Sequence, residues 1–177
     1  MEENRIDPKA LFTFSYGLYI VGTVWQEKLN AQIADAVMQL TSDPIHIAVC
    51  LHRDNLTTEL VTKSRKFTVS VLAQEASLPF IGTFGFRTGR DFDKFVKCAY
   101  TLTESGLPIV TESTLAAVEA DVVEIVEVHT HKLFIGKVKS ARALAEGTPL
   151  TYADYHKIKK GKSPENAPSA VFNALKP

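Results

Sequence analysis

The sequences LAAVEADVVEIVEV at residues 115–128 and HKLFIGKVKSARA at residues 131–143 decide the fold. Both are rich in residues that favour β-strands, and two residues separate them, so they predict a long β-hairpin. Further strands are predicted at residues 17–25 and 28–40, joined by a tight turn, and at 45–51 and 67–72. Six or seven strands with a few short helices indicate a mainly β fold closed into a barrel, which removes exposed sheet edges.

The helices are predicted to be short. Residues 8–14, 55–64 and 152–159 fit single helices, and Asn55 or Thr57 can cap the second of them. Residues 77–97 mix phenylalanine, glycine and charged residues too irregularly for one long element, so loops and short helical turns are expected there. We expect one domain over residues 1–160 and a polar tail over 161–177.

The composition excludes several classes of protein. The chain has 177 residues, 45% hydrophobic and 23% charged, which suits one soluble domain with a sizeable core. Twenty basic residues balance twenty acidic ones, so neither nucleic acid nor a membrane surface is expected as a main partner. The polar N-terminus is not a signal peptide, and no apolar stretch approaches the roughly 18 residues of a membrane span. The expected location is therefore the cytoplasm.

General motifs for catalysis or metal binding are missing. Cys50 and Cys98 share no metal-binding spacing, and Cys50 fits a small buried hydrophobic residue at the end of a strand. His129 and His131 would share one face of a strand, but no third ligand has a suitable spacing. No metal site is predicted. Taken alone, the residues indicate a β-barrel with a polar loop region rich in glycine and aromatic residues.

Several short motifs follow one another in order along nearly the whole chain. They are Gln39-Leu40-Thr41-Ser42-Asp43-Pro44, then Asp54-Asn55-Leu56-Thr57, residues 64–72 (SRKFTVSVL), residues 81–91 (IGTFGFRTGRD) with Lys94-Phe95, His131 before Phe134-Ile135-Gly136, and residues 149–156 (PLTYADYH). Each motif alone is weak, but the ordered set resembles the flavin reductase-like family, the FMN-binding split barrels. Flavoredoxins and the flavin domains of high-molecular-weight rubredoxins are the most similar members. The resemblance implies a split barrel with a Greek-key core, forming a homodimer with FMN near the interface.

The resemblance also implies a set of site residues. Asn30, Thr57, Lys94 and His131 would form a polar shell around the flavin, with Lys94 and His131 as catalytic residues. Lys94 would favour the negative charge of the reduced ring, and His131 would donate to the flavin or place the nicotinamide. The other residues implied in cofactor binding are Gln39, Leu40, Thr41, Ser42, Asn55, Ser64, Phe84 and Gly85.

Part of this site has a physical rationale and a competing explanation. Backbone amides at the start of the helix over residues 55–64 suit a phosphate group. Helix capping explains Asn55 and Thr57 equally well, however, and surface positions would explain Lys94 and His131 if the resemblance were set aside.

The function that the resemblance implies is NAD(P)H-dependent reduction of bound FMN. Electrons would then pass to a small redox protein such as rubredoxin, or to flavin. Two alternatives stay open: a flavin reductase that supplies free reduced flavin to a monooxygenase, and an FMN-binding electron carrier without enzymatic activity.

The chain departs from the family pattern at three places. Ala31 follows Asn30 where relatives commonly carry glycine, and Asp35-Ala36 replaces larger or neutral residues. The Asp35 charge would oppose an anionic reduced flavin. Residues 161–168 resemble the linker that leads into rubredoxin in longer relatives, but no Cys-x-x-Cys is present, so no iron site is expected in this chain.

Overall fold

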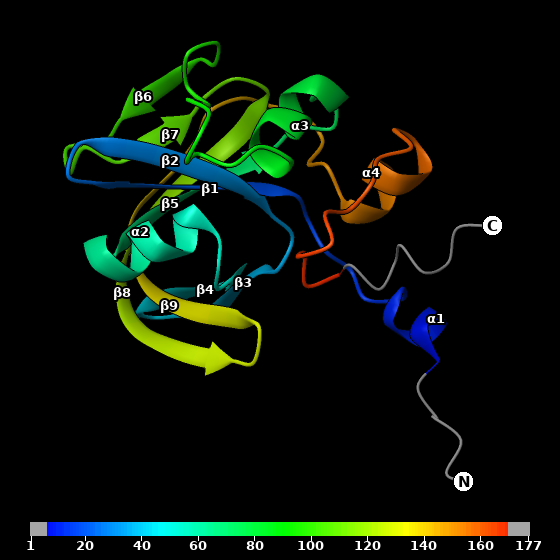
Figure 1. Ribbon diagram of the computed structural model, residues 1–177, viewed down its shortest axis with the longest axis horizontal. Helices are drawn as coiled ribbons and strands as arrows, with labels where there is room; N and C mark the ends of the chain where they lie inside the picture. Colours follow the sequence, from blue (N-terminus) through cyan, green and yellow to red (C-terminus); the bar gives the residue numbers. More distant parts are fainter. Residues whose placement is uncertain (1–6, 170–177) are drawn as a thin grey trace, which may run out of the picture.

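Seven antiparallel strands form one strongly curved sheet in the order β2-β1-β5-β8-β9-β4-β3 (Figure 1). The structure, a computed structural model, describes residues 7–169; residues 1–6 and the end of the predicted tail, 170–177, lie outside it. The strands of the sheet are β1 (Tyr19–Trp25), β2 (Lys28–Ala34), β3 (Val37–Ser42), β4 (Ile45–His52), β5 (Lys66–Leu72), β8 (Thr114–Val128) and β9 (His131–Ala143). A second sheet pairs β6 (Tyr100–Leu102) with β7 (Pro108–Val110), two short strands that the sequence did not predict.

Both predicted hairpins are confirmed. Strands β8 and β9 pair antiparallel from Val128 opposite His131 to Ala116 opposite Ala143. Strands β1 and β2 are joined by Gln26 and Glu27, whose φ angles are 47° and 63°. Two successive positive φ angles define a type I′ turn, whose twist matches that of the flanking strands.

The predicted strand over residues 28–40 is wrong, because the chain breaks it into β2 and β3. The amide of Val37 donates to the carbonyl of Asp35 at 3.0 Å, which closes a three-residue turn. Aspartate is depleted in β-strands, and Asp35 lies at the break between β2 and β3. Its side chain is buried there. As a result β2 and β3 lie at opposite ends of the strand order.

The barrel is split. Among the described residues no β ladder joins β2 to β3, so the expectation of a barrel closed by hydrogen bonds is not met. The fold is the mainly β, split-barrel class that the sequence predicted. The edges are left open because Asp35-Ala36 carries the chain from one edge strand to the other without pairing them.

Four short helices complete the fold: α1 (Pro8–Leu11), α2 (Leu56–Ser64), α3 (Leu78–Gly85) and α4 (Tyr152–Lys157). Helix α3 lies in the segment expected to be irregular. Its start is set by Ser77, whose hydroxyl accepts from the amide of Phe80, and by a proline in the first turn. No helix of the described chain is long and apolar enough to cross a membrane.

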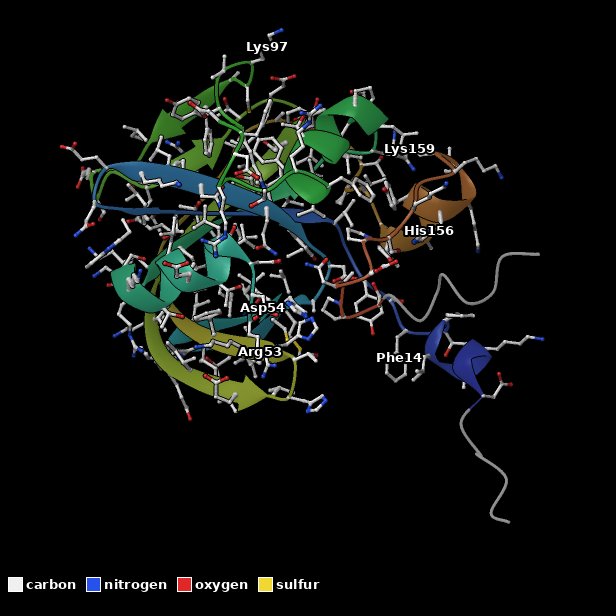
Figure 2. All side chains as sticks on the ribbon, viewed as in Figure 1. Phe14, Arg53, Asp54, Lys97, His156 and Lys159 are labelled. Carbon is white, nitrogen blue, oxygen red and sulfur yellow. The ribbon has the colours of Figure 1, made fainter. Side chains whose placement is uncertain are left out.

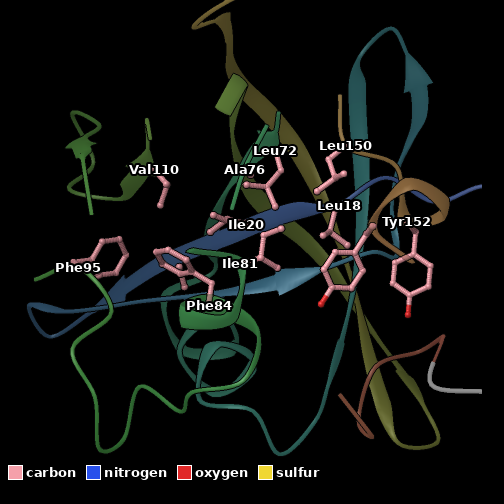
Figure 3. Close-up of a cluster of buried hydrophobic side chains, with 12 residues drawn as sticks. Leu18, Ile20, Leu72, Ala76, Ile81, Phe84, Phe95, Val110, Leu150 and Tyr152 are labelled. Carbon is pink, nitrogen blue, oxygen red and sulfur yellow. The ribbon is translucent and has the colours of Figure 1, made fainter. Parts of the chain in front are cut away.

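Alternation along β1 divides the apolar side chains between two cores. Ile20 belongs to the cluster between the sheet, α3 and α4 that Figure 3 shows, together with Leu18, Phe84 and Tyr152. Val21 points the other way, into the barrel. The first cluster is what holds α3 and α4 against β1 and β2, so it positions the residues of the site.

The barrel core depends on a close approach between Phe67 and Gly136. Phe67 is fully buried. A Cβ atom placed on Gly136 would lie 2.7 Å from two atoms of the Phe67 ring. Only glycine therefore fits on β9 opposite this ring.

Candidate functional site

A cleft of about 690 Å³ opens on one side of the sheet. Strand β2, the end of β4 and the start of α2 form its floor, and α3 with residues 86–89 forms a second side. Tyr152 and Tyr155 of α4, followed by residues 162–168, complete the wall. Asp54, labelled in Figure 2, marks the position of the cleft at the end of β4.

At the start of α2 the structure brings three predicted residues together. Asn55 occupies the N-cap position, but its side chain makes no capping hydrogen bond. Thr57 and Asn30 are buried, and the Asn30 amide donates to the Thr57 hydroxyl at 2.8 Å. All three line the cleft. Helix capping therefore does not account for Asn55, and the first amides of α2 remain available to an anion.

Gly89 sits directly against this polar group. A Cβ atom there would collide with the side-chain amide of Asn30 and would approach Leu56 to 3.1 Å. The loop after α3 can therefore close on the start of α2 only because residue 89 is glycine. Arg87 and Thr88 of the same loop also line the cleft, and they are residues that sequence reasoning did not single out.

Lys94 lies in the wall of the cleft with only 5% of its surface exposed. Its ammonium donates to the carbonyl of Ala31 at 2.7 Å and to that of Phe84 at 3.3 Å. Burial lowers the pKa of Lys94 to about 8. A surface position for this lysine is thus excluded, whereas Lys97 is exposed and points outward in Figure 2.

His131 lies beside the cleft without lining it. Its ring contacts that of His52, which does line the cleft, with 5.1 Å between the ring centroids. Its Nδ1 atom is 2.8 Å from the Thr130 hydroxyl, its Nε2 atom is buried, and the backbone of Asn166 in the tail forms a further hydrogen bond with the ring. Burial, and then the neighbouring His52, lower the pKa of His131. His131 is therefore a half-buried imidazole next to the cleft.

Five predicted cofactor residues lie elsewhere in this single chain. Gln39, Leu40, Thr41 and Ser42 are exposed on β3, where the Thr41 hydroxyl bonds the carbonyl of Pro44 and the ring of His46. Ser64 ends α2, at the opposite end from Asn55, and its hydroxyl lies 2.9 Å from that of Thr23. The two remaining predictions, Phe84 and Gly85, do line the cleft.

Two residues that line the cleft, Cys50 and His52, were not predicted as site residues. Cys50 was expected to be a buried hydrophobic residue, but it is only partly buried and lines the cleft, and burial together with the charge of Asp35 raises the pKa of its thiol. His52 lies two residues further along β4 and therefore faces the same side. The period of two along this strand is the signal that could have identified both residues.

Asp35 and the tail form the last part of the cleft. Asp35, noted above as a departure, is 4% exposed, and its carboxylate accepts a hydrogen bond from Ser169. Asn166 donates to the side chain of Asn55 at 2.8 Å. The described part of the polar tail thus lies on the domain, which nothing in its composition indicated.

Comparisons with known proteins agree with this geometry. The family model described as flavin reductase like domain matches residues 11–159. The chain is 46% identical over 164 residues to the high molecular weight rubredoxin of Moorella thermoacetica, covering 93% of this chain and 72% of that protein. It is 46% identical over 162 residues to the ferric-chelate reductase (NAD(P)H) of Archaeoglobus fulgidus, covering 92% and 96%.

A solved structure shares the fold. The FMN-binding protein from Thermus thermophilus, with bound 1-cyclohex-2-enone, superposes with a TM-score of 0.71 at 26% identity and covers 80% of each chain.

Proposed function

This chain belongs to the family of flavin reductase like domains and is an FMN-binding oxidoreductase, and from that premise we propose that NAD(P)H reduces the FMN and that the electrons pass to a small redox protein such as rubredoxin, or to flavin. The observation that carries the proposal is the position of Lys94. Its buried ammonium lies in the wall of the same cleft as the start of α2. One cleft therefore offers a phosphate site and a cation for a reduced ring.

The described residues fit FMN. Cavities that hold ligands of this size measure roughly 300–1,000 Å³, and the cleft measures about 690 Å³. The first amides of α2, with Asn55 and Thr57, would hold the phosphate. Gln32 lines the cleft, and its buried Oε1 atom has no hydrogen-bond partner among the described residues. It is an acceptor suited to an N–H group of the flavin edge.

The chemistry divides between the cofactor and the chain. Bound FMN supplies a ring that accepts a hydride at N5. Lys94 would stabilise negative charge in the cleft. Its ammonium is already held in place in a site of low dielectric, so no side chain has to rearrange when that charge develops. His131 and His52 stand at the side of the cleft, where they can orient a nicotinamide. Phe84 and Tyr152 exclude water from the inner wall.

We further propose that the protein is a homodimer built on the β3 edge. Met38 and Leu40 on β3 expose 61% and 43% of their surfaces, and Ile45 at the start of the neighbouring β4 exposes 45%. An apolar group at an unpaired strand edge favours association. A second copy at this edge would also bring its own Gln39, Thr41 and Ser42 toward an interface, which is where the family resemblance expects them to act.

The test is an absorption spectrum of the purified protein followed by anaerobic addition of NADH or NADPH. We expect a yellow protein with about one FMN per chain, which bleaches on addition of nicotinamide and is reoxidised by rubredoxin. A ferric chelate belongs among the acceptors tested, because the Archaeoglobus relative bears that activity in its name.

Each alternative gives a different result. A reductase that releases free reduced flavin would lose its colour on gel filtration and show saturation kinetics in added FMN. A carrier without enzymatic activity would keep its colour but remain oxidised after nicotinamide is added. A colourless protein that takes up no FMN would refute the proposal. The cytoplasm remains the proposed location.

A further inference from the structure

We propose that residues 161–169 form a strap that retains FMN in the cleft, with Ser163 and Ser169 as the positioning residues that hold the strap closed. The proposal rests on the proposed function, since it concerns how long the cofactor stays bound. It predicts that this protein keeps its flavin as a prosthetic group. The strap is fixed at both ends and once between them.

The first end of the strap is fixed on α4. Ser163 is 6% exposed, and its hydroxyl is hydrogen bonded to that of Tyr152 and lies 3.2 Å from Nε2 of His156. The Tyr155 hydroxyl donates to the carbonyl of Lys162 at 2.8 Å. Gly161 packs so closely on the Tyr155 ring that a Cβ atom there would collide with it. Residues 161–163 are therefore held on α4 by hydrogen bonds and by close packing.

The second end is fixed on the break between β2 and β3. Ser169 is 3% exposed and donates its hydroxyl to the carboxylate of Asp35, which is 4% exposed. A buried carboxylate needs a donor, so this hydrogen bond is costly to break. The charge of Asp35, which the family pattern does not call for, therefore has a structural partner in the strap.

Between its ends the strap crosses the start of α2. The side-chain amide of Asn166 donates to Oδ1 of Asn55 at 2.8 Å. This contact explains why Asn55 does not cap its own helix. It also brings the strap to the start of α2, next to the amides that would hold the FMN phosphate.

The strap is a wall of the cleft and does not fill it. Residues 162–168 line the cleft, and about 690 Å³ remains open with the strap in place. That volume lies within the range of cofactor cavities. Figure 1 shows the strap, in orange to red, running from α4 toward β3. If the strap retains a ligand here, opening its anchors should widen the cleft and speed release.

The experiment measures FMN release from the full-length protein. Wild type, Ser163→Ala, Ser169→Ala and the double variant are loaded with FMN and diluted, and the rise in FMN fluorescence gives the dissociation rate constant. We expect the double variant to release FMN at least tenfold faster than wild type. Ser140→Ala, which removes an exposed hydroxyl on β9, is the matched control and should release FMN at the wild-type rate.

Two further variants separate retention from folding. Ser169→Thr keeps the hydroxyl that Ser169→Ala removes, so it should release FMN as slowly as wild type. A variant whose packing is generally disturbed would not do so. Asn166→Ala removes only an exposed hydrogen bond, so it should speed release by a smaller factor without changing the unfolding midpoint of the apoprotein. If Ser169→Ala fails to fold because Asp35 loses its hydrogen-bond donor, Asn166→Ala still tests the proposal.

Three results would overturn the strap. The first is an FMN dissociation rate constant that equals the wild-type value in both the double variant and Asn166→Ala. The second is faster FMN uptake by the double variant at an unchanged release rate, which would show that the tail competes with FMN for the cleft. A wild type that binds no FMN would overturn the proposed function as well, whereas the first two results leave that function intact.

Discussion

The ammonium of Lys94 lies 2.7 Å from the carbonyl oxygen of Ala31, on the strand that forms the floor of the cleft. Its other acceptor is the carbonyl of Phe84. Both are neutral groups, so no counter-charge in this hydrogen-bond set cancels the ammonium. The position brings an anion in the cleft close to a positive charge that has no ion-pair partner in this set.

Replacing Lys94 with methionine should lower the reduction potential of the bound flavin. A buried cation near a developing anion contributes roughly 1–3 kcal/mol, which is about 20–65 mV for a two-electron couple. Methionine keeps the apolar stem, so oxidised FMN should still bind. The measurement is a redox titration of the holoprotein, with the rate of reduction by NADH as a second readout, which should also fall.

Lys97→Met is the control for this prediction, because Lys97 is exposed three residues away. It should leave the potential almost unchanged. Equal shifts in both variants would mean that Lys94 exerts only a general surface-charge effect.

The same lysine makes the stability of the apoprotein depend on pH. Burial lowers the pKa of Lys94 from 10.5 to about 8, so between these values the unfolded chain binds more protons than the folded chain. The contribution of Lys94 to stability therefore rises with pH across this window. Lys94→Met lacks that rise, so the unfolding free energy of wild type should increase relative to that of the variant by up to about 3 kcal/mol from pH 7 toward pH 10.

Urea unfolding of both apoproteins at pH 7 and pH 9.5 checks this expectation. Lys97→Met, measured in parallel, corrects for the loss of one lysine. If the difference between Lys94→Met and wild type stayed constant with pH, the lysine would not be buried as described.

The difference between Lys94 and Lys97 marks the limit of what the sequence could predict. Both lie in a polar, aromatic loop region with no regular period, so local pattern cannot say which lysine turns inward. The strands and hairpins were predictable because their apolar residues alternate or cluster and because their turns are short. Residues 100–102 and 108–110 are too short to give such a signal.

The site shows the same division. Asn55 and Thr57 could be placed at the start of α2 from the sequence, because a helix start has local capping residues. Asp35, Ser169 and Tyr152 come from distant parts of the chain and meet only through tertiary packing. No local pattern could have indicated their contacts.

The protein should be a dimer at micromolar concentration, and a charge on the β3 edge should dissociate it. Met38→Glu places a carboxylate where 61% of an apolar side chain is exposed, so it should produce a monomer near 19.5 kDa. Light scattering coupled to gel filtration measures the mass. Ile158→Glu adds the same charge at an exposed position on the last turn after α4 and should remain dimeric. A wild type that scatters as a monomer with flavin bound would contradict the dimer.

Gly136→Ala should destabilise the barrel by roughly 1–3 kcal/mol, because the new methyl group would push into the fully buried Phe67 ring. The unfolding free energy in urea is the measurement. Gly82→Ala is the matched control: its Cβ atom would meet only Phe86, at 4.0 Å, and alanine favours helix α3 by roughly 0.5–1 kcal/mol over glycine. Two equal losses would show that the contact with Phe67 is not the cause.

The hydrogen bond from Ser169 to Asp35 also holds residue 169, the last described residue, at the break between β2 and β3 beside the cleft. An electron carrier fused after this point by a short linker would meet the flavin at an effective concentration in the millimolar range, so that tethering would replace diffusional encounter. The buried aspartate thereby determines the geometry of any covalent redox relay built on this domain.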